Sequence, residues 1–248
     1  MSLFNEKLRD IRLKEVLSLI IFLFLIQYFL NAFNIINLDS FWIYLVLILY
    51  FIYKLRDNLP ERSDFTGVFG ARVFGQIIMI VVLNVFLSYG FLYLSDHVLN
   101  FIPSFGLSHS ITGIGLLATI LISPISEELI FRGVFLNRLN LVVPTVFAVL
   151  ISSLLFASLH TYGSITSAFI FGVCMAILYL KTGNVLVAIF AHFLNNLLAE
   201  LIVIIDSGKV LFTNGAVVGV MSVLAAISFV LVLWFIVREL KYINNNKV

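Results

Sequence analysis

The residues of this sequence whose types could do chemistry are few, and they gather in three otherwise apolar segments. They are Glu127, Glu128 and Arg132 in SPISEELIFRGVFLNR, His160 in LLFASLHTY, and His192, Asn195 and Asn196 in AHFLNN. A charged side chain at the centre of a bilayer costs roughly 2.5–3.5 kcal/mol on insertion scales. If these segments cross a membrane, their ionisable groups are therefore candidates for a functional site.

The spacing of these residues places them in pairs on helix faces. Glu128 and Arg132 are four residues apart, so they share one face and can form an ion pair that lowers the cost of burying both. Glu127 lies about 100° further round the helix and stays free for other partners. The pairs Phe156–His160 and His192–Asn196 have the same spacing of four. We expect the three polar faces to turn toward each other rather than toward lipid.

Two kinds of hydrolytic chemistry fit this set of residues. A glutamate in apolar surroundings suits a general base that acts on water near neutral pH, and a histidine beside it can share the proton or hold the water. A second histidine and an asparagine amide could then stabilise a tetrahedral oxyanion. Two histidines and a carboxylate are also a normal ligand set for a catalytic zinc ion. The residues alone leave both schemes open.

Each residue also has a purely structural explanation. Glu128 with Arg132 could be a structural ion pair, the histidines could be packed at helix ends, and the asparagines could link helices. Ser126 is expected to be a packing hydroxyl rather than a nucleophile. Cys174, the only cysteine, excludes an internal disulfide and is expected to be a small packed side chain. It is the occurrence of all these polar groups together that favours a site.

Composition indicates that a membrane positions these segments. Hydrophobic residues make up 62% of the 248 residues and charged residues 11%, against roughly 25% charged residues in soluble domains. The mean hydropathy is +1.13. A net charge of +2 without a basic cluster gives no reason to expect a nucleic-acid partner. The fold class that we predict is all-α, a polytopic bundle of transmembrane helices.

A spanning helix needs about 20 mainly apolar residues, and this criterion yields about eight candidate spans. They cover about residues 16–36, 38–53, 74–95, 111–131, 143–163, 165–180, 185–205 and 215–237. With the N-terminus inside, every lysine and arginine except Lys209 falls on the inner side, so both termini are predicted to be cytoplasmic. The connection Lys54–Phe74 is expected to be a water-exposed loop, and His97 and His109 are expected to be solvated in an outer loop.

The three motifs together resemble those of a known family. EExxxR (Glu127, Glu128, Arg132), FxxxH (Phe156, His160) and HxxxN (His192, Asn196) are similar in order and spacing to the motifs of the CPBP family. This family contains the CAAX proteases and bacteriocin-processing enzymes and is also called Abi. The resemblance covers about residues 115–200. We therefore expect residues 1–248 to form one integral membrane domain with a CPBP-like catalytic core at 111–205.

The resemblance implies a membrane-embedded endopeptidase with a helical-bundle core. Glu127 and His160 would activate the water, His192 and Asn196 would stabilise the oxyanion, and Glu128 and Arg132 would brace the site, with Phe156 and Asn195 as supporting neighbours. The family has been described both as metalloproteases, which would make Glu127, His160 and His192 zinc ligands, and as glutamate-dependent proteases. We prefer the metal-independent version, with no cofactor required. A short peptide precursor or membrane-associated peptide is the expected substrate, and a bacterial cell membrane the expected location.

Two alternatives and one geometric difficulty remain at this point. The same residues could relay protons in a proton-coupled transporter, or the bundle could act as a non-catalytic immunity factor or scaffold. The difficulty is depth, because straight helices with the expected boundaries place Glu127 toward the inner side and His160 toward the outer side. The mismatch is on the order of 10 Å at a rise of 1.5 Å per residue. A tilt, a bend near Pro124 or shifted helix boundaries could remove it.

Overall fold

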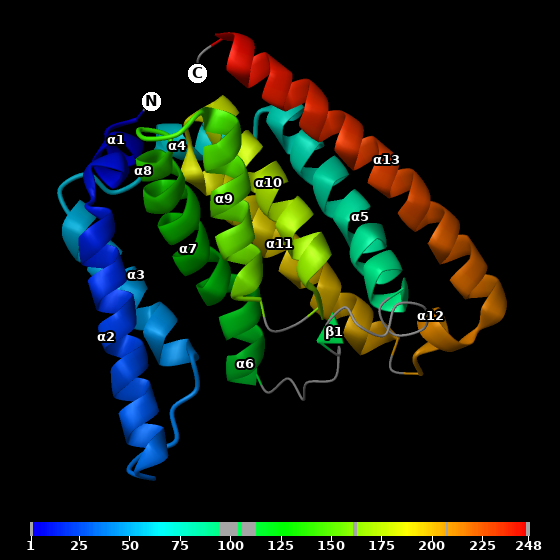
Figure 1. Ribbon diagram of the computed structural model, residues 1–248, viewed down its shortest axis with the longest axis horizontal. Coiled ribbons are helices and arrows are strands. Elements are labelled where there is room, and N and C mark those ends of the chain that lie inside the picture. The colour runs from blue at the N-terminus through cyan, green and yellow to red at the C-terminus, as the bar shows by residue number, and fades with distance from the viewer. Residues whose placement is uncertain (1, 95–103, 106–112, 161–162, 207, 247–248) are drawn as a thin grey trace.

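Apolar helices make up nearly all of the part of the chain that the structure describes. The computed structural model describes residues 2–94, 104–105, 113–160, 163–206 and 208–246 (Figure 1). His97 and His109 lie outside these ranges. In chain order the elements are α1 (Leu3–Asp10), α2 (Leu13–Ala32), α3 (Phe41–Leu55), α4 (Arg62–Val68), α5 (Ala71–Leu94), β1 (Ser104–Phe105), α6 (Gly113–Leu117), η2 (Ala118–Ile122), α7 (Ser123–Glu128), η3 (Leu129–Leu136), α8 (Asn137–Leu139), α9 (Thr145–Ser158), β2 (Gly163–Ser164), α10 (Ile165–Thr182), α11 (Val185–Ile205), α12 (Val210–Thr213) and α13 (Gly215–Asn246).

The predicted all-α membrane bundle is confirmed. Within the described residues, six helical stretches are long and apolar enough to cross a bilayer, and α3 and α9 are shorter apolar helices. Each of the eight ranges expected from the sequence falls on one of these helices. β1 and β2 form only a two-residue antiparallel bridge. The chain is an integral membrane protein, whereas the number of spans and the cytoplasmic position of the termini stay predictions.

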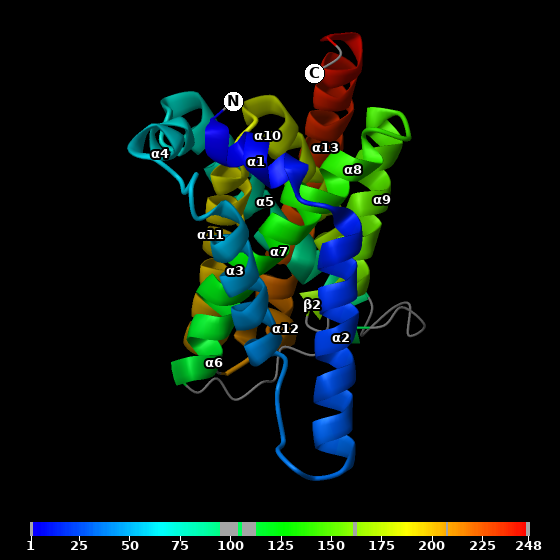
Figure 2. The same ribbon diagram turned by 90° about the vertical axis from the view of Figure 1, so that its left-hand side faces the viewer.

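The helix α10 is the centre of the bundle. Buried residues make up 72% of its apolar stretch, against 11% for α2. The helices α9, α5 and α11 pack against α10, and α13 runs along α5. Figure 1 shows α13 and α2 at opposite edges of the bundle, and both views show α2 extending beyond the other helices at its far end (Figure 2). The helix α1 and the end of α13 lie at the same end of the bundle (Figure 1).

The turn between α10 and α11 ties this end of the bundle together. Gly183 ends α10 with a φ of 62°, in the left-handed region that glycine adopts at low cost. Asn184 then caps α11 by accepting from the backbone N–H of Leu186. Its amide also donates to the carbonyl oxygen of Asp64 in α4, 2.6 Å away. Asn5 of α1 accepts from the backbone N–H of Val185 at 2.9 Å.

The segment expected to be an exposed loop is therefore partly structured and packed. The connection Lys54–Phe74 contains α4, which begins with a capping box formed by Glu61 and Asp64. Asp64 and Val68 are both buried. The charged sequence KLRDNLPERSD predicted a water-exposed loop. The structure differs because a capped helix can bury one face while its other charged side chains stay in water.

Shifted helix boundaries remove the depth mismatch between Glu127 and His160. The stretch from α6 to α8 is a continuous run of 27 residues, Gly113–Leu139, so Glu127 lies near its middle rather than near its inner end. The helix α9 has only 14 residues, which reach about 21 Å against a hydrocarbon core of roughly 30 Å. Figure 1 shows that α9 ends partway along the bundle, and His160 follows that end. The predicted range 143–163 was too long for one helix.

Candidate active site

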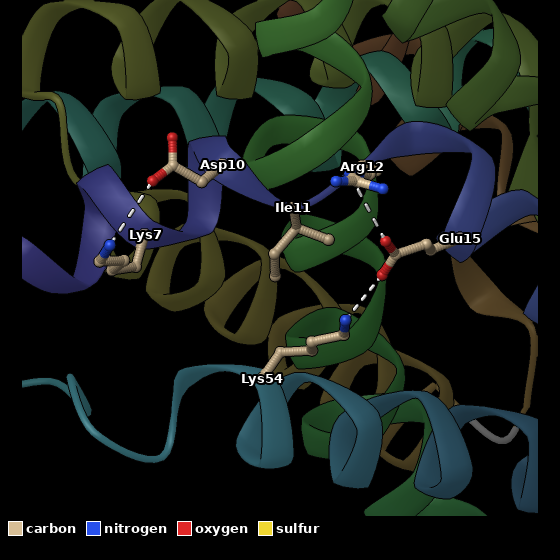
Figure 3. A pocket seen from close by; sticks show the side chains of 6 residues that line it. All are labelled: Lys7, Asp10, Ile11, Arg12, Glu15 and Lys54. Carbon is tan, nitrogen blue, oxygen red and sulfur yellow. Dashed lines mark ion pairs between the residues drawn. The ribbon is translucent and has the colours of Figure 1, made fainter.

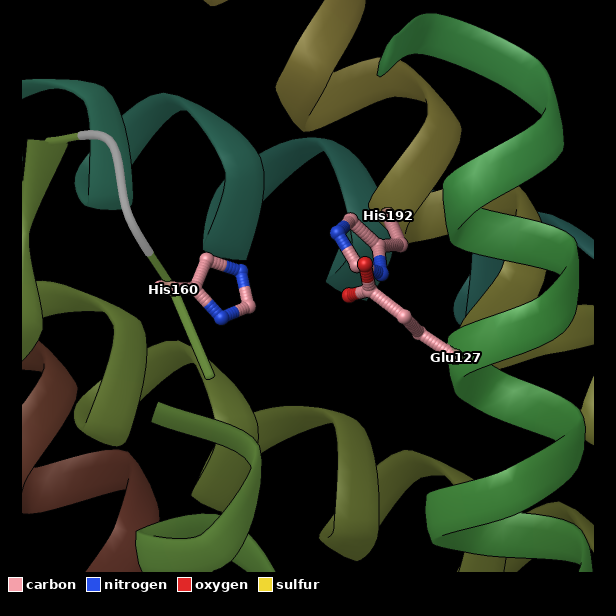
Figure 4. Close-up of side chains that lie close together, drawn as sticks. All are labelled: Glu127, His160 and His192. Atoms are coloured by element: carbon pink, nitrogen blue, oxygen red, sulfur yellow. The ribbon is translucent and has the colours of Figure 1, made fainter. Parts of the chain in front are cut away.

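Glu127, His160 and His192 come together in the middle of the bundle. One ligand atom from each of the three side chains lies within 4.8 Å of the others. Glu127 belongs to α7, His192 to α11, and His160 follows the end of α9, so three separate elements build the cluster (Figure 4). His192 is buried, and Glu127 and His160 are half-buried. The predicted convergence of three polar helix faces is thus present in the structure.

The end of α9 fixes the orientation of His160. Its Nδ1 lies 2.9 Å from the carbonyl oxygen of Phe156, in the last turn of the helix, where the same carbonyl also accepts from the backbone N–H of Leu159 at 3.3 Å. Since a carbonyl oxygen can only accept, Nδ1 carries the hydrogen and Nε2 keeps a free lone pair. The rings of Phe156 and His160 pack at 4.3 Å between centroids. The FxxxH spacing therefore provides both the ring contact and the hydrogen bond.

The second histidine is held by a buried ion pair. Nδ1 of His192 lies 2.8 Å from Oε1 of Glu128, and the same oxygen accepts from Nη1 of Arg132 at 3.0 Å. The predicted pair of Glu128 and Arg132 is therefore present, and both side chains are fully buried. Because an ionised carboxylate can only accept, Nδ1 of His192 carries the hydrogen and its Nε2 is also free.

Arg132 holds this pair in place through two further contacts. Its Nη2 donates to the carbonyl oxygen of Gly172 in α10 at 2.9 Å. The carbon of its guanidinium group lies 4.3 Å from the centroid of the Phe156 ring, a cation–π contact whose strength increases when water is excluded. Arg132 thus connects η3, α9 and α10, and it holds Glu128 in contact with His192.

Two residues that sequence reasoning missed contact Glu127. The Ser123 hydroxyl, one turn earlier on the same helix, donates to Oε1 of Glu127. The Tyr44 side chain, from α3, lies beside both Ser123 and Glu127. Oε2 of Glu127 is buried and has no hydrogen-bond partner among the described residues. The spacing of Ser123 and Glu127 was a readable signal, whereas nothing in the local sequence points to Tyr44.

A π-helical segment before the two glutamates explains where Asn196 binds. In η2 the N–H of Ser123 bonds to the carbonyl of Ala118, five residues earlier. The next bond of this pattern would come from Pro124, which has no N–H, so the carbonyl of Thr119 needs another donor. Nδ2 of Asn196 supplies it at 2.9 Å. One hydrogen of the Asn196 amide is therefore engaged, and the other has no acceptor among the described residues.

Asn195 and Asn196 are linked to each other and to α5. Nδ2 of Asn195 lies 3.3 Å from Oδ1 of Asn196, and Nδ2 of Asn84 donates to Oδ1 of Asn195 at 2.8 Å. Asn84 was not selected from the sequence, although an asparagine inside the apolar range 74–95 is a signal that could have drawn attention to it. The other two residues considered in the sequence, Ser126 and Cys174, are both buried, as expected for packed side chains.

The cluster has the donor set of a zinc site. Two imidazoles each present a free Nε2, and each has its Nδ1–H donated to an oxygen, the arrangement that usually orients metal-binding histidines. Glu127 adds a carboxylate oxygen that is buried without a partner among the described residues. These residues fit a zinc ion by type and orientation. They equally fit a water molecule, which donates two hydrogens and needs two acceptors.

A pocket of about 360 Å³ lies elsewhere, where α1, α2 and α3 meet (Figure 3). It is lined by Lys7, Asp10, Ile11, Arg12, Glu15 and Lys54. Glu15 pairs with Lys54 at 2.7 Å and with Arg12 at 3.8 Å, and Lys7 pairs with Asp10 at 3.8 Å. Its charges therefore compensate one another in partly exposed ion pairs, which are typical of a solvated surface rather than a catalytic centre.

Comparison with known proteins agrees with this geometry. Comparisons with curated proteins and with solved structures gave no match. Residues 109–198, which contain all three motifs, match the family described as type II CAAX prenyl endopeptidase Rce1-like. This match confirms the resemblance to CAAX proteases and implies a membrane-embedded endopeptidase that acts on protein or peptide substrates. The segment that builds the Glu127–His160–His192 cluster therefore lies within the part of the chain that matches the Rce1-like family of CAAX proteases.

Proposed function

We propose that this chain is an intramembrane endopeptidase in which Glu127 and His160 activate a water molecule for attack on a peptide bond. The observation that carries the proposal is the cluster of Glu127, His160 and His192 within 4.8 Å, inside a segment that matches a protease family. Hydrolysis of a peptide bond needs a base for the water, donors for the oxyanion and a proton for the leaving nitrogen. The cluster and its neighbours offer a group for each task.

The free atoms of Glu127 and His160 suit a water molecule. Oε2 of Glu127 and Nε2 of His160 both accept, and one water can donate a hydrogen to each while its oxygen lone pair turns toward the substrate. Glu127 then takes one proton as the water oxygen forms a bond to the carbonyl carbon. The protonated Glu127 returns that proton to the amide nitrogen as the C–N bond breaks. This proton transfer regenerates the Glu127 carboxylate, and the products then leave.

The oxyanion of the tetrahedral intermediate receives hydrogen bonds from α11. Asn196 offers the amide hydrogen that is not bound to Thr119. His192 can donate only as an imidazolium, because its Nδ1–H already goes to Glu128 and its Nε2 must gain a proton. The Glu128 carboxylate, which Arg132 holds in place, stabilises the positive charge of that imidazolium. In this division of roles Glu127 acts on the water and Glu128 supports His192.

The same side chains could hold a zinc ion. Glu127, His160 and His192 would be its ligands, and a bound zinc would supply a Lewis acid that makes water a stronger nucleophile at neutral pH. We propose the metal-independent version. In either version Glu128 orients His192, and the carbonyl of Phe156 orients His160.

The proposed substrates are short peptide precursors or membrane-associated peptides, and the proposed location is a bacterial cell membrane. The Rce1-like match also makes a prenylated CAAX peptide a rational probe. A quenched fluorescent peptide, prepared with and without a prenylated CAAX end, therefore serves for purified protein. Prenyl dependence appears as a difference in KM between the two forms of this peptide.

The experiment that tests the function compares membrane peptides from cells that carry the wild-type or the Glu127→Ala protein. A peptide substrate should accumulate uncut in Glu127→Ala cells, and its cut product should disappear. Glu200→Ala is the matched control, because Glu200 is another buried glutamate, two turns from His192 on α11. Identical peptide profiles in all three strains would refute the proposal. Complementation of a deletion by Glu127→Ala would instead indicate a scaffold, and pH-coupled flux in liposomes a transporter.

A further inference from the structure

Three asparagine amides form a continuous row from α5 to the proposed active site. Asn84 of α5 donates to Asn195 at 2.8 Å, and Asn195 donates to Asn196 at 3.3 Å. Asn196 in turn donates to the carbonyl of Thr119 in η2 at 2.9 Å. Asn195 and Asn196 belong to α11. The row therefore joins three helices through side-chain amides.

The direction of every hydrogen bond in this row is set by its last member. The Thr119 carbonyl can only accept, so Asn196 must turn its NH₂ group toward it. Oδ1 of Asn196 then points the other way and needs a donor, which is Nδ2 of Asn195. Oδ1 of Asn195 needs a donor for the same reason, and Nδ2 of Asn84 supplies it. A side chain at position 84 that lacked an N–H would break the row at its start.

Asn84 itself is buried at an energetic cost. Asn84 is 5% exposed, and its Oδ1 has no hydrogen-bond partner among the described residues. An unsatisfied buried acceptor is unfavourable, and a leucine of nearly the same shape would avoid it. What Asn84 offers at this position is its donor, and the only acceptor found for it in the described part of the chain is Oδ1 of Asn195.

We propose that Asn84 is a positioning residue for the reaction. Through Asn195 it holds the Asn196 amide in the orientation that directs its second hydrogen toward the oxyanion. This inference rests on the proposed function, because it assigns to Asn196 the role of an oxyanion donor. Asn84 lies outside the residues 109–198 that match the protease family, so the orientation of Asn196 depends on a helix outside that segment.

A matched control lies one turn away on the same helix. Ser88 of α5 donates to the hydroxyl of Ser167 in α10 at 2.9 Å, so it also forms a side-chain hydrogen bond between α5 and a neighbouring helix. The described hydrogen bonds of Ser88 do not lead to Asn195 or Asn196. Ser88→Ala therefore removes an interhelical hydrogen bond without touching the amide row.

The test measures kcat and KM with the fluorescent peptide for wild type, Asn84→Leu, Asn196→Ala, the double variant and Ser88→Ala. Loss of an oxyanion donor lowers kcat by about 100-fold, which we expect for Asn196→Ala. We expect Asn84→Leu to lower kcat by about tenfold with KM changed less than about twofold, and the double variant to be no slower than Asn196→Ala, since residues that act as a unit are not additive. Ser88→Ala should match wild type.

Several outcomes would overturn the inference. One is wild-type kcat in Asn84→Leu, another is losses that multiply in the double variant, and a third is an equal loss in Ser88→Ala. If wild type itself does not cleave the peptide, the proposed function fails. The positioning role of Asn84 is then tested by a measurement that does not need turnover. NMR of protein labelled with ¹⁵N asparagine, with Asn196→Asp to assign the signal, should show faster exchange of the Asn196 amide hydrogens in Asn84→Leu. Unchanged exchange would refute the positioning role.

Discussion

His160 donates its Nδ1 hydrogen to the carbonyl oxygen of Phe156, 2.9 Å away and four residues earlier in the chain. This bond leaves Nε2 free on the side of the ring that faces Glu127. The Phe156 ring also packs against His160, at 4.3 Å between centroids, and lies 4.3 Å from the guanidinium carbon of Arg132. Phe156 therefore connects His160 to the Glu128–Arg132 ion pair that contacts His192.

The tight packing at Gly172 leads to the first prediction. A Cβ atom at this position would lie 3.1 Å from Cδ1 of Phe156 and 3.3 Å from Nη2 of Arg132, closer than ordinary van der Waals contact. We expect Gly172→Ala to destabilise the protein by about 1–3 kcal/mol, as overpacking usually does, and to lower turnover because Arg132 and Phe156 both move. Thermal unfolding and cleavage of the fluorescent peptide measure the two effects.

Gly219→Ala is the control for Gly172→Ala. A Cβ atom on Gly219 of α13 would meet no heavy atom within 4 Å, so this variant should keep both the stability and the turnover of wild type. Equal stability and activity in the two alanine variants would show that the contacts around Gly172 do not constrain the site.

The buried pair of Arg132 and Glu128 gives the second prediction. Arg132→Met leaves Glu128 charged and without its guanidinium, and removal of one partner of a buried pair costs about 3–5 kcal/mol. In the double variant Glu128→Gln/Arg132→Met no charge is left unpaired, so most of that stability should return. Turnover should stay low, because His192 has lost the carboxylate that would stabilise its positive charge when it donates to the oxyanion. Thermal unfolding and kcat separate these two effects.

Lys181→Met provides the comparison for this pair. Lys181 pairs with Glu239 at 2.8 Å, and Arg238 pairs with the same carboxylate. Glu239 therefore keeps one cation in Lys181→Met, and the loss of stability should be smaller than in Arg132→Met. Recovery of both stability and turnover in Glu128→Gln/Arg132→Met would contradict the role given to Glu128.

The third prediction concerns metal. In the metal-independent scheme, purified protein should contain less than about 0.1 zinc per chain and should keep its activity in the presence of a chelator. If catalysis needed zinc, the chelator would remove the ion from its ligands and turnover would be lost. Elemental analysis and cleavage assays with and without chelator measure this. Zinc bound at one ion per chain, lost in His160→Ala and needed for cleavage, would replace the scheme by the metal-dependent one with the same three residues.

Much of the fold and the composition of the site could be predicted from the sequence, for local reasons. Apolar length identifies helices, and a spacing of four residues places Glu128 beside Arg132 and Phe156 beside His160. Depth could not be predicted in the same way. The helix α9 ends at Ser158, and the continuous stretch that carries Glu127 extends to Leu139 through the π-helical η3. Hydropathy alone marks neither feature.

Contacts between distant segments were also beyond the sequence. The bond of Asn196 to the Thr119 carbonyl depends on the π-helical pattern that Pro124 interrupts. Tyr44 and Asn84 approach the site from α3 and α5, outside the three motifs. Their positions follow from the packing of whole helices, which the spacing of residues within one helix does not encode.

The central claim is that Glu127 is the base that activates water, and cleavage by purified protein in lipid tests it most directly. Glu127→Gln keeps the shape of the side chain and removes its capacity to take a proton. It should lower kcat by at least about 1,000-fold, in the upper range of general-base contributions, while the helical content and unfolding temperature stay those of wild type. Turnover of Glu127→Gln within about tenfold of wild type would contradict the assignment of Glu127 and, with it, the mechanism built on the Glu127–His160 pair.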